Sequence, residues 1–149
     1  MQYNFNVKSP VFEPGKYVVI DPCYVFGNND TFWNDFCYFL GNQRYVYGFI
    51  EIDNYYVYYF NTKYGDGQYP VYKKDDVDNM YEPKFIGVDS GMLSIIPIEI
   101  FDKYYDRKVH NENSTSDLRL GAIIELKKQT FPENKNCNVK LGKYRIDTR

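Results

Sequence analysis

Residues 44–61, RYVYGFIEIDNYYVYYFN, contain two runs of aromatic and β-branched residues separated by Asp53 and Asn54. Such residues favour strands, and Asp and Asn are common in the tight turns of antiparallel hairpins. We therefore predict a hairpin with strands at Arg44–Asp53 and Tyr55–Asn61. Apolar and polar residues do not alternate in the second run, so both faces of that strand carry aromatic side chains. Either this strand lies inside the sheet, or a partner or second subunit covers its outer face.

Further short strands and two helices are expected on both sides of this hairpin. The strands are predicted at Lys16–Asp21, Gln68–Tyr72, Lys84–Asp89, Met92–Ile96, Gly121–Gln129 and Asn138–Asp147. The helices are predicted at Phe32–Leu40, capped by Asp30 or Thr31, and from Pro97 through Tyr105. The sequence thus predicts an α+β fold, a mostly antiparallel, strongly bent sheet or small barrel of about seven or eight strands. We expect one domain over residues 1–149, with 106–117 as a mobile loop.

The composition narrows the class of protein. The chain has 149 residues and a formal net charge of −2, so it lacks the cationic excess of a strongly basic nucleic-acid binder, and a double-stranded nucleic acid is not an expected partner. No apolar run approaches the roughly 20 residues that span a bilayer, so no membrane association is expected. The three cysteines form no CxxC motif, and Cys37, in an apolar stretch, is expected in the core. Reduced thiols and an N-terminus unlike a signal peptide favour a cytoplasmic location.

Three short motifs resemble, in this order, motifs of a known family. They are Asp21-Pro22-Cys23-Tyr24 at the end of a predicted strand, Tyr64-Gly65-Asp66-Gly67 in a predicted loop, and Val88-Asp89-Ser90-Gly91 between two predicted strands. Together they resemble a group of small, uncharacterised proteins of bacteria and their phages, over about residues 16–97. The resemblance implies a shared compact domain, a bacterial cytoplasm as the location, and a role in host interaction or counter-defence. It implies no particular activity.

The carboxylates of these motifs are the candidate catalytic or metal-binding groups. Asp21, Asp66 and Asp89 each lie at a strand end or a tight turn, and neighbouring strands would bring them to one rim. Clustered carboxylates bind Mg²⁺ or Ca²⁺, and a metal with open positions activates water for hydrolysis. The alternative is ordinary turn chemistry, in which the carboxylate accepts backbone N–H groups. Asp76, Asp78 and Glu82 do not have the spacing of a calcium-binding loop.

The second motif also suggests a ligand-binding surface. Gly-rich turns present backbone N–H groups to anions, and a nucleotide base stacks on tyrosines. The candidate residues for a nucleotide-like ligand are Tyr24, Tyr64, Gly65, Asp66, Gly67 and Tyr69. The alternative is that these tyrosines simply pack in strands. His110, the only histidine, lies in a polar stretch without a Gly-x-Ser-x-Gly motif, so a triad-type nucleophile is not expected.

We therefore expect a non-enzymatic binding module that recognises a protein or a nucleotide-like ligand. One alternative is a metal-dependent hydrolase that uses Asp21, Asp66 and Asp89 with Mg²⁺ or Ca²⁺. Another is a structural subunit of an assembly, a possible homo-oligomer held through exposed strand edges.

Overall fold

The computed structural model describes residues 1–7, 11–41, 46–74, 83–112 and 118–148 of the chain. They contain eleven strands and three helices. The strands are β1 (Tyr3–Asn4), β2 (Gly15–Ile20), β3 (Tyr47–Ile52), β4 (Tyr55–Asn61), β5 (Gly67–Lys73), β6 (Lys84–Val88), β7 (Met92–Pro97), β8 (Ala122–Leu126), β9 (Glu133–Lys135), β10 (Asn138–Leu141) and β11 (Tyr144–Ile146). The helices are α1 (Cys23–Phe26), α2 (Asp30–Leu40) and α3 (Ile98–Tyr104). No helix among these residues is long and apolar enough to cross a membrane.

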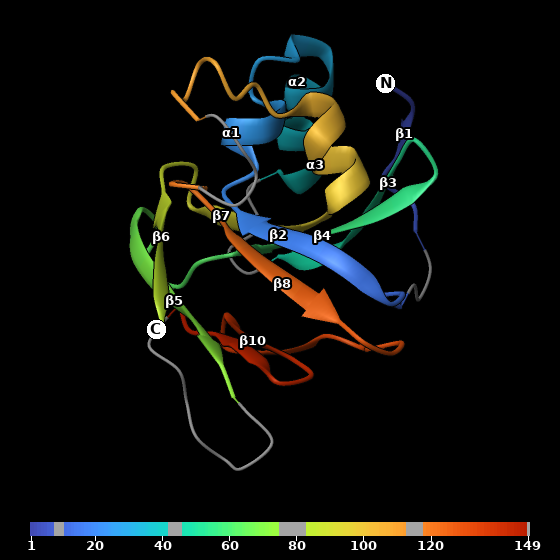
Figure 1. Cartoon of the computed structure of the whole chain (residues 1–149). Helices are drawn as coiled ribbons and strands as arrows, with labels where there is room; N and C mark the ends of the chain where they lie inside the picture. Colours follow the sequence, from blue (N-terminus) through green and yellow to red (C-terminus); the bar gives the residue numbers. More distant parts are fainter. Residues whose placement is uncertain (8–10, 42–45, 75–82, 113–117, 149) are drawn as a thin grey trace.

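The strands form two antiparallel sheets. The first sheet has the order β1-β3-β4-β7-β2-β8, and the second has the order β6-β5-β11-β10-β9. The three helices lie together on one side of the first sheet, and the second sheet lies on its other side (Figure 1). The fold therefore has three layers, with the six-stranded sheet in the middle.

Both faces of the middle sheet are buried at its centre, in β2, β4 and β7, and each face belongs to a separate core. In β2, Val18 and Ile20 pack with the helices, whereas Val19 packs with the second sheet. In β4, Tyr59 belongs to the helix-side core and Phe60 to the core between the sheets. Aromatic residues on both faces of β4 are thus explained by the chain itself. The strand lies inside the sheet, between β3 and β7.

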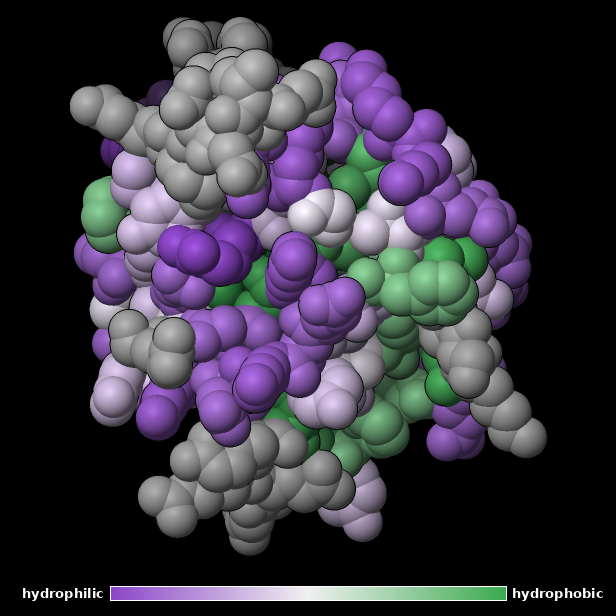
Figure 2. Space-filling view, turned by 90° about the horizontal axis from the view of Figure 1, so that it is seen from below, coloured by the Kyte–Doolittle hydropathy of each residue, from purple (hydrophilic) through white to green (hydrophobic). Residues whose placement is uncertain are grey.

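The second sheet has one buried and one solvent-facing side. Val139, Leu141 and Ile146 are buried against the first sheet, while Lys140 and Arg145 between them are exposed. Seen from below, this face of the molecule is largely hydrophilic, with apolar residues gathered toward one side (Figure 2). The alternation of buried and exposed residues along β10 and β11 is typical of an antiparallel sheet with one solvent-exposed face.

The predicted hairpin at residues 44–61 is confirmed where it is described. β3 and β4 pair from Tyr47 opposite Phe60 to Ile52 opposite Tyr55. The turn residues Asp53 and Asn54 have φ values of 48° and 68°, as in a type I′ turn.

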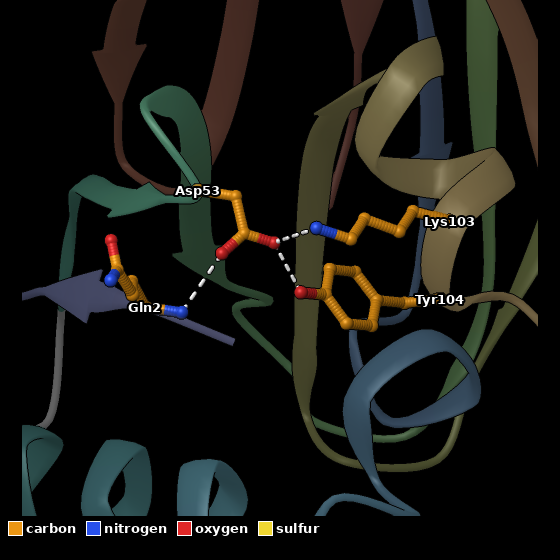
Figure 3. Close-up of polar contacts among 4 residues, drawn as sticks. All are labelled: Gln2, Asp53, Lys103 and Tyr104. Carbon is orange, nitrogen blue, oxygen red and sulfur yellow. Dashed lines mark hydrogen bonds and ion pairs between the residues drawn. The ribbon is translucent and has the colours of Figure 1, made fainter.

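Asp53 also fixes this turn to two distant parts of the chain (Figure 3). Its carboxylate accepts hydrogen bonds from the Gln2 backbone N–H at 2.8 Å, from Lys103 Nζ at 2.8 Å and from the Tyr104 hydroxyl. The hydrogen bonds from Lys103 and Tyr104 hold the pKa of Asp53 well below its usual range. The hairpin turn is thereby joined to both the N-terminal strand and α3.

The predicted class, α+β and mostly antiparallel, is confirmed, but the described residues contain eleven strands and three helices instead of about seven or eight and two, and other details also differ. The described strands form two sheets instead of one, and the chain passes from one sheet to the other between β4 and β5 and between β6 and β7. Residues 138–147, expected as one strand, form the hairpin β10–β11, with Gly142 at φ 60° in the turn. The cap of α2 is Asn29, whose side chain accepts from the Phe32 N–H, rather than Asp30 or Thr31. Cys37 is exposed on α2, so its expected place in the core is wrong.

Candidate functional site

The three sequence motifs meet at one end of the molecule, where the chain leaves one layer for another. Residues 62–66 lead from β4 in the first sheet to β5 in the second, and residues 89–91 lead back from β6 to β7. At the same end, β2 is followed by α1 in the helical layer (Figure 1). We call this region, comprising residues 21–24, 62–67 and 89–91, the corner.

Asp21 is the centre of the corner. Its side chain is fully buried and accepts four hydrogen bonds. Oδ2 accepts from the backbone N–H groups of Asp89 at 2.7 Å and Ser90 at 2.8 Å. Oδ1 accepts from the Cys23 N–H at 2.8 Å and the Ser90 hydroxyl at 2.6 Å. A carboxylate has about four lone-pair sites, so Asp21 has none left for a metal or a substrate in this arrangement.

The other two segments of the corner are joined by Thr62. Its buried hydroxyl lies 2.5 Å from the carbonyl oxygen of Gly65 and 3.2 Å from that of Gly91. The Tyr69 hydroxyl donates to the same Gly65 carbonyl at 2.8 Å. Gly65 and Gly91 have φ values of 74° and 73°, a conformation that suits glycine. The glycines of the second and third motifs thus shape the crossovers.

The remaining carboxylates make the corner locally negative. Asp89 is exposed and accepts a hydrogen bond from the Tyr24 hydroxyl, and Asp66 is exposed on the neighbouring turn. Burial, followed by the charges of Asp21, Asp89 and Asp66, raises the pKa of the Cys23 thiol far above its usual range. Burial and the Asp89 carboxylate also raise the pKa of the Tyr24 hydroxyl. Cys23 therefore stays a thiol at neutral pH, which does not suit a nucleophile.

His110 reaches the edge of the corner through aromatic contacts. Its ring stacks on Tyr105 at 5.0 Å between centroids and makes a T-shaped contact with Tyr24 at 5.7 Å. Nearby, the buried carboxylate of Glu112 accepts from the Tyr105 hydroxyl and from the Arg119 N–H. Residues 106–112 are therefore packed onto the fold at Glu112, while 113–117 lie outside the described residues. The mobility expected of 106–117 stays a prediction.

The predicted ligand-binding residues divide into two groups. Gly65, Gly67 and the buried Tyr69 lie where the chain crosses from β4 to β5, and the Tyr69 hydroxyl donates to the Gly65 carbonyl. Tyr24 is half-buried, and Asp66 and Tyr64 are exposed, Tyr64 to 69 %. Gly67 is also exposed and Gly65 half-buried, so the predicted ligand contacts stay a prediction.

The carboxylates expected to share a metal have different roles, since Asp21 is buried and fully hydrogen-bonded whereas Asp66 and Asp89 are exposed. Among the described residues, no group of three or more His, Cys, Asp or Glu side chains is arranged to hold a metal. Asp76, Asp78 and Glu82 lie outside the described residues. Because Asp21 is engaged by its own chain, a carboxylate-dependent hydrolase would have to work with Asp66 and Asp89 alone. That alternative stays a prediction.

Sequence reasoning missed three contributors to the corner. Cys23 begins the short helix α1 with Pro22 at its cap, although no helix was expected there. Ser90 supplies two donors to Asp21, and the only sign of this was its place beside Asp89 in the motif. Thr62 carries no recognisable signal in the sequence.

Comparisons of the chain with protein-family models, curated proteins and solved structures each find no match. The resemblance of the three motifs to bacterial and phage proteins stays a prediction.

Proposed function

We propose that this chain is a non-enzymatic binding module that recognises a protein partner through the exposed side chains of the corner. Tyr24, Tyr64, Asp66 and Asp89 are the residues of this surface. The observation that carries the proposal is that the motif residues of the corner have two different roles, one structural and one at the surface. Asp21, engaged by the N–H groups of Cys23, Asp89 and Ser90 and by the Ser90 hydroxyl, fixes the turn at 89–91 to the start of α1. Of the other motif side chains, Tyr64, Asp66 and Asp89 are exposed and Tyr24 is half-buried.

The chemistry of this surface favours a cationic protein group over a nucleotide. Two exposed carboxylates would repel phosphates brought to the Gly65 turn, whereas they attract the Lys or Arg side chains of a partner. Tyrosine supplies rigid contact area with a polar tip, and its face also attracts cations. Lys63 Nζ lies 5.7 Å from the Tyr64 ring centroid, so a partner's cation would have to displace this exposed lysine or use the other face of the ring.

Host interaction or counter-defence in a bacterial cytoplasm is the more specific form of this proposal. Its support is the resemblance of the three motifs, in order, to bacterial and phage proteins. The partner would then be a host protein that presents a basic patch.

The test compares a corner variant with a matched control. The corner variant combines Tyr64→Ala, Asp66→Asn and Asp89→Asn. The control combines Tyr38→Ala, Glu99→Gln and Glu133→Gln, which removes one exposed tyrosine and two exposed carboxylates elsewhere. We expect a bacterial protein to be captured by the wild type and the control and lost by the corner variant. Titration calorimetry with that purified protein should then show a loss of affinity of at least about 30-fold, or about 2 kcal/mol.

Equal capture by the corner variant and the control would contradict the proposal. Substrate turnover that is abolished by Asp66→Ala, or by a chelator, would instead support the hydrolase. A mass of several subunits in light scattering, unchanged by the corner variant, would favour the structural subunit.

A further inference from the structure

An open strand edge lies along one side of the second sheet. The two described sheets end in the strands β1, β8, β6 and β9. β1 and β9 have only two and three residues, and on β8 the Glu125 backbone N–H already donates to the Tyr144 hydroxyl at 3.1 Å. β6 has five residues and lies at the left-hand side of the molecule in Figure 1. It is therefore the edge on which a further strand is best able to pair.

The pairing of β6 with β5 determines which backbone groups of β6 face away from the sheet. Pro70 of β5 lies opposite Phe85, and its carbonyl oxygen accepts a hydrogen bond from the Asp147 N–H on the other side of β5. The N–H and C=O groups of one residue point to the same side of a strand, and that side alternates from residue to residue. Because Pro70 is turned away from β6, the N–H and C=O groups of Phe85 and Gly87 point outward.

These outward groups have no partner within the described part of the chain. No hydrogen bond joins the backbone of Phe85 or Gly87 to a described residue outside β5. Gly87 has no side chain and is only half-buried, so its backbone itself meets solvent. The open stretch ends on both sides, because Pro83 has no N–H and the Asp89 N–H is held by Asp21. Two donors and two acceptors are thus left open at residues 85 and 87.

We infer that β6 is a self-association edge, on which a second copy of this chain adds its own β6 in antiparallel pairing. The open groups are symmetric about Ile86, so a two-fold axis at that residue pairs Phe85 of each copy with Gly87 of the other. Each of these pairs exchanges two N–H···O bonds, so every open group is used. The Phe85 side chain, 56 % exposed, then lies beside a residue without a side chain. Such an aromatic neighbour across the strands stabilises an edge glycine.

The second sheets of the two copies then form one continuous sheet across the axis. The exposed Gln68 side chain lies over Gly87 and has to turn aside for the incoming ring. Only residues 85–87 of each strand take part, so the interface is small, and we expect a dimer with a dissociation constant between about 1 µM and 1 mM. The pairing uses no side chain of the corner, so the inference stands apart from the proposed function.

The test measures self-association of the whole chain by sedimentation velocity and compares three variants. Phe85→Pro removes an outward N–H that the pairing with β5 does not use, and proline is tolerated at such edge positions. Phe85→Ala removes the ring but keeps this N–H. Phe131→Ala is the matched control, because it removes another exposed ring, 71 % exposed, that lies outside β6. Thermal melts verify that each variant is folded.

We expect the wild type to change from monomer to dimer, and to no larger assembly, as its concentration rises to about 1 mM. Phe85→Pro should raise the dissociation constant of the dimer at least about tenfold, equivalent to about 1.4 kcal/mol. Phe85→Ala should raise it less, since only the contact of the ring with Gly87 is lost. Phe131→Ala should leave it within about twofold of the wild type.

Amide hydrogen exchange of the wild type provides a second reading that needs no variant. The Phe85 and Gly87 amides should exchange fast in dilute protein and slowly in concentrated protein, whereas the Ile86 amide, bonded to β5, should be protected in both. A protein that stays monomeric to about 1 mM would overturn the inference. So would a dimer that Phe85→Pro weakens no more than Phe131→Ala does, or one that leaves the exchange of the two outward amides unchanged. Protection of these amides only in a complex with a different protein would assign the edge to that partner and rule out the second copy.

Discussion

Replacing Asp21 is the sharpest test of how the corner is built. If its carboxylate mainly holds the turn at 89–91 against the start of α1, Asp21→Asn and Asp21→Ala should both destabilise the fold. If the carboxylate were kept for catalysis or for a metal, its removal would relieve charge repulsion and stabilise the free protein, as often happens at functional sites. The two roles therefore predict opposite signs for the change in the free energy of unfolding.

The magnitude follows from the four hydrogen bonds at Asp21. Asp21→Ala removes the acceptor of three backbone N–H groups and the Ser90 hydroxyl at a fully buried position. Each such bond contributes about 1.5–3 kcal/mol, but bonds within one network are not additive. We expect a loss of about 3–5 kcal/mol. Asn keeps one oxygen for Asp89 and Ser90 and turns its NH₂ toward the Cys23 N–H, so about 2–3 kcal/mol should be lost.

Urea unfolding at neutral pH measures this change, and thermal unfolding provides a second reading. A loss of about 3 kcal/mol corresponds to a fall in Tm of about 6–12 °C for a domain of this size. Asp66→Asn is the matched control, because it removes an exposed carboxylate from the same corner, and it should change stability by less than about 0.5 kcal/mol. The reasoning is refuted if Asp21→Asn destabilises the protein no more than this control does.

Three further substitutions test other parts of the structure by urea unfolding. Asp53→Asn keeps a residue suited to the type I′ turn but removes the charge that pairs with Lys103, so it should cost about 1–2 kcal/mol at neutral pH. The pKa of Asp53 is lower in the folded than in the unfolded chain. The difference in the free energy of unfolding between the wild type and Asp53→Asn should therefore be full above the unfolded-state pKa of about 4, and it should shrink as the pH falls below that value. Tyr105→Phe leaves the buried Glu112 carboxylate without its hydroxyl donor and should cost about 1–3 kcal/mol. Gly91→Ala should cost about 1–2 kcal/mol through its φ of 73° alone, since its new Cβ would only meet Gly65 Cα at 3.9 Å.

Much of the fold could be predicted because its signals are local. The β3–β4 hairpin, the strand at β2 and the helices α2 and α3 follow from side-chain periodicity, turn residues and caps that lie within the segment itself. The division into two sheets could not be predicted in this way. Strands β6 and β7 are separated by only three residues, yet they belong to different sheets. That separation depends on long-range hydrogen bonds to Asp21.

The candidate site was predictable in its residues but not in their roles. The three motifs do come together, because each marks a place where the chain changes layer. Which carboxylate is buried and which is exposed depends on the backbone donors around it. Asp21 and Asp66 look alike in sequence, since each lies beside Pro or Gly, but only Asp21 has the N–H groups of residues 89 and 90 directed at it.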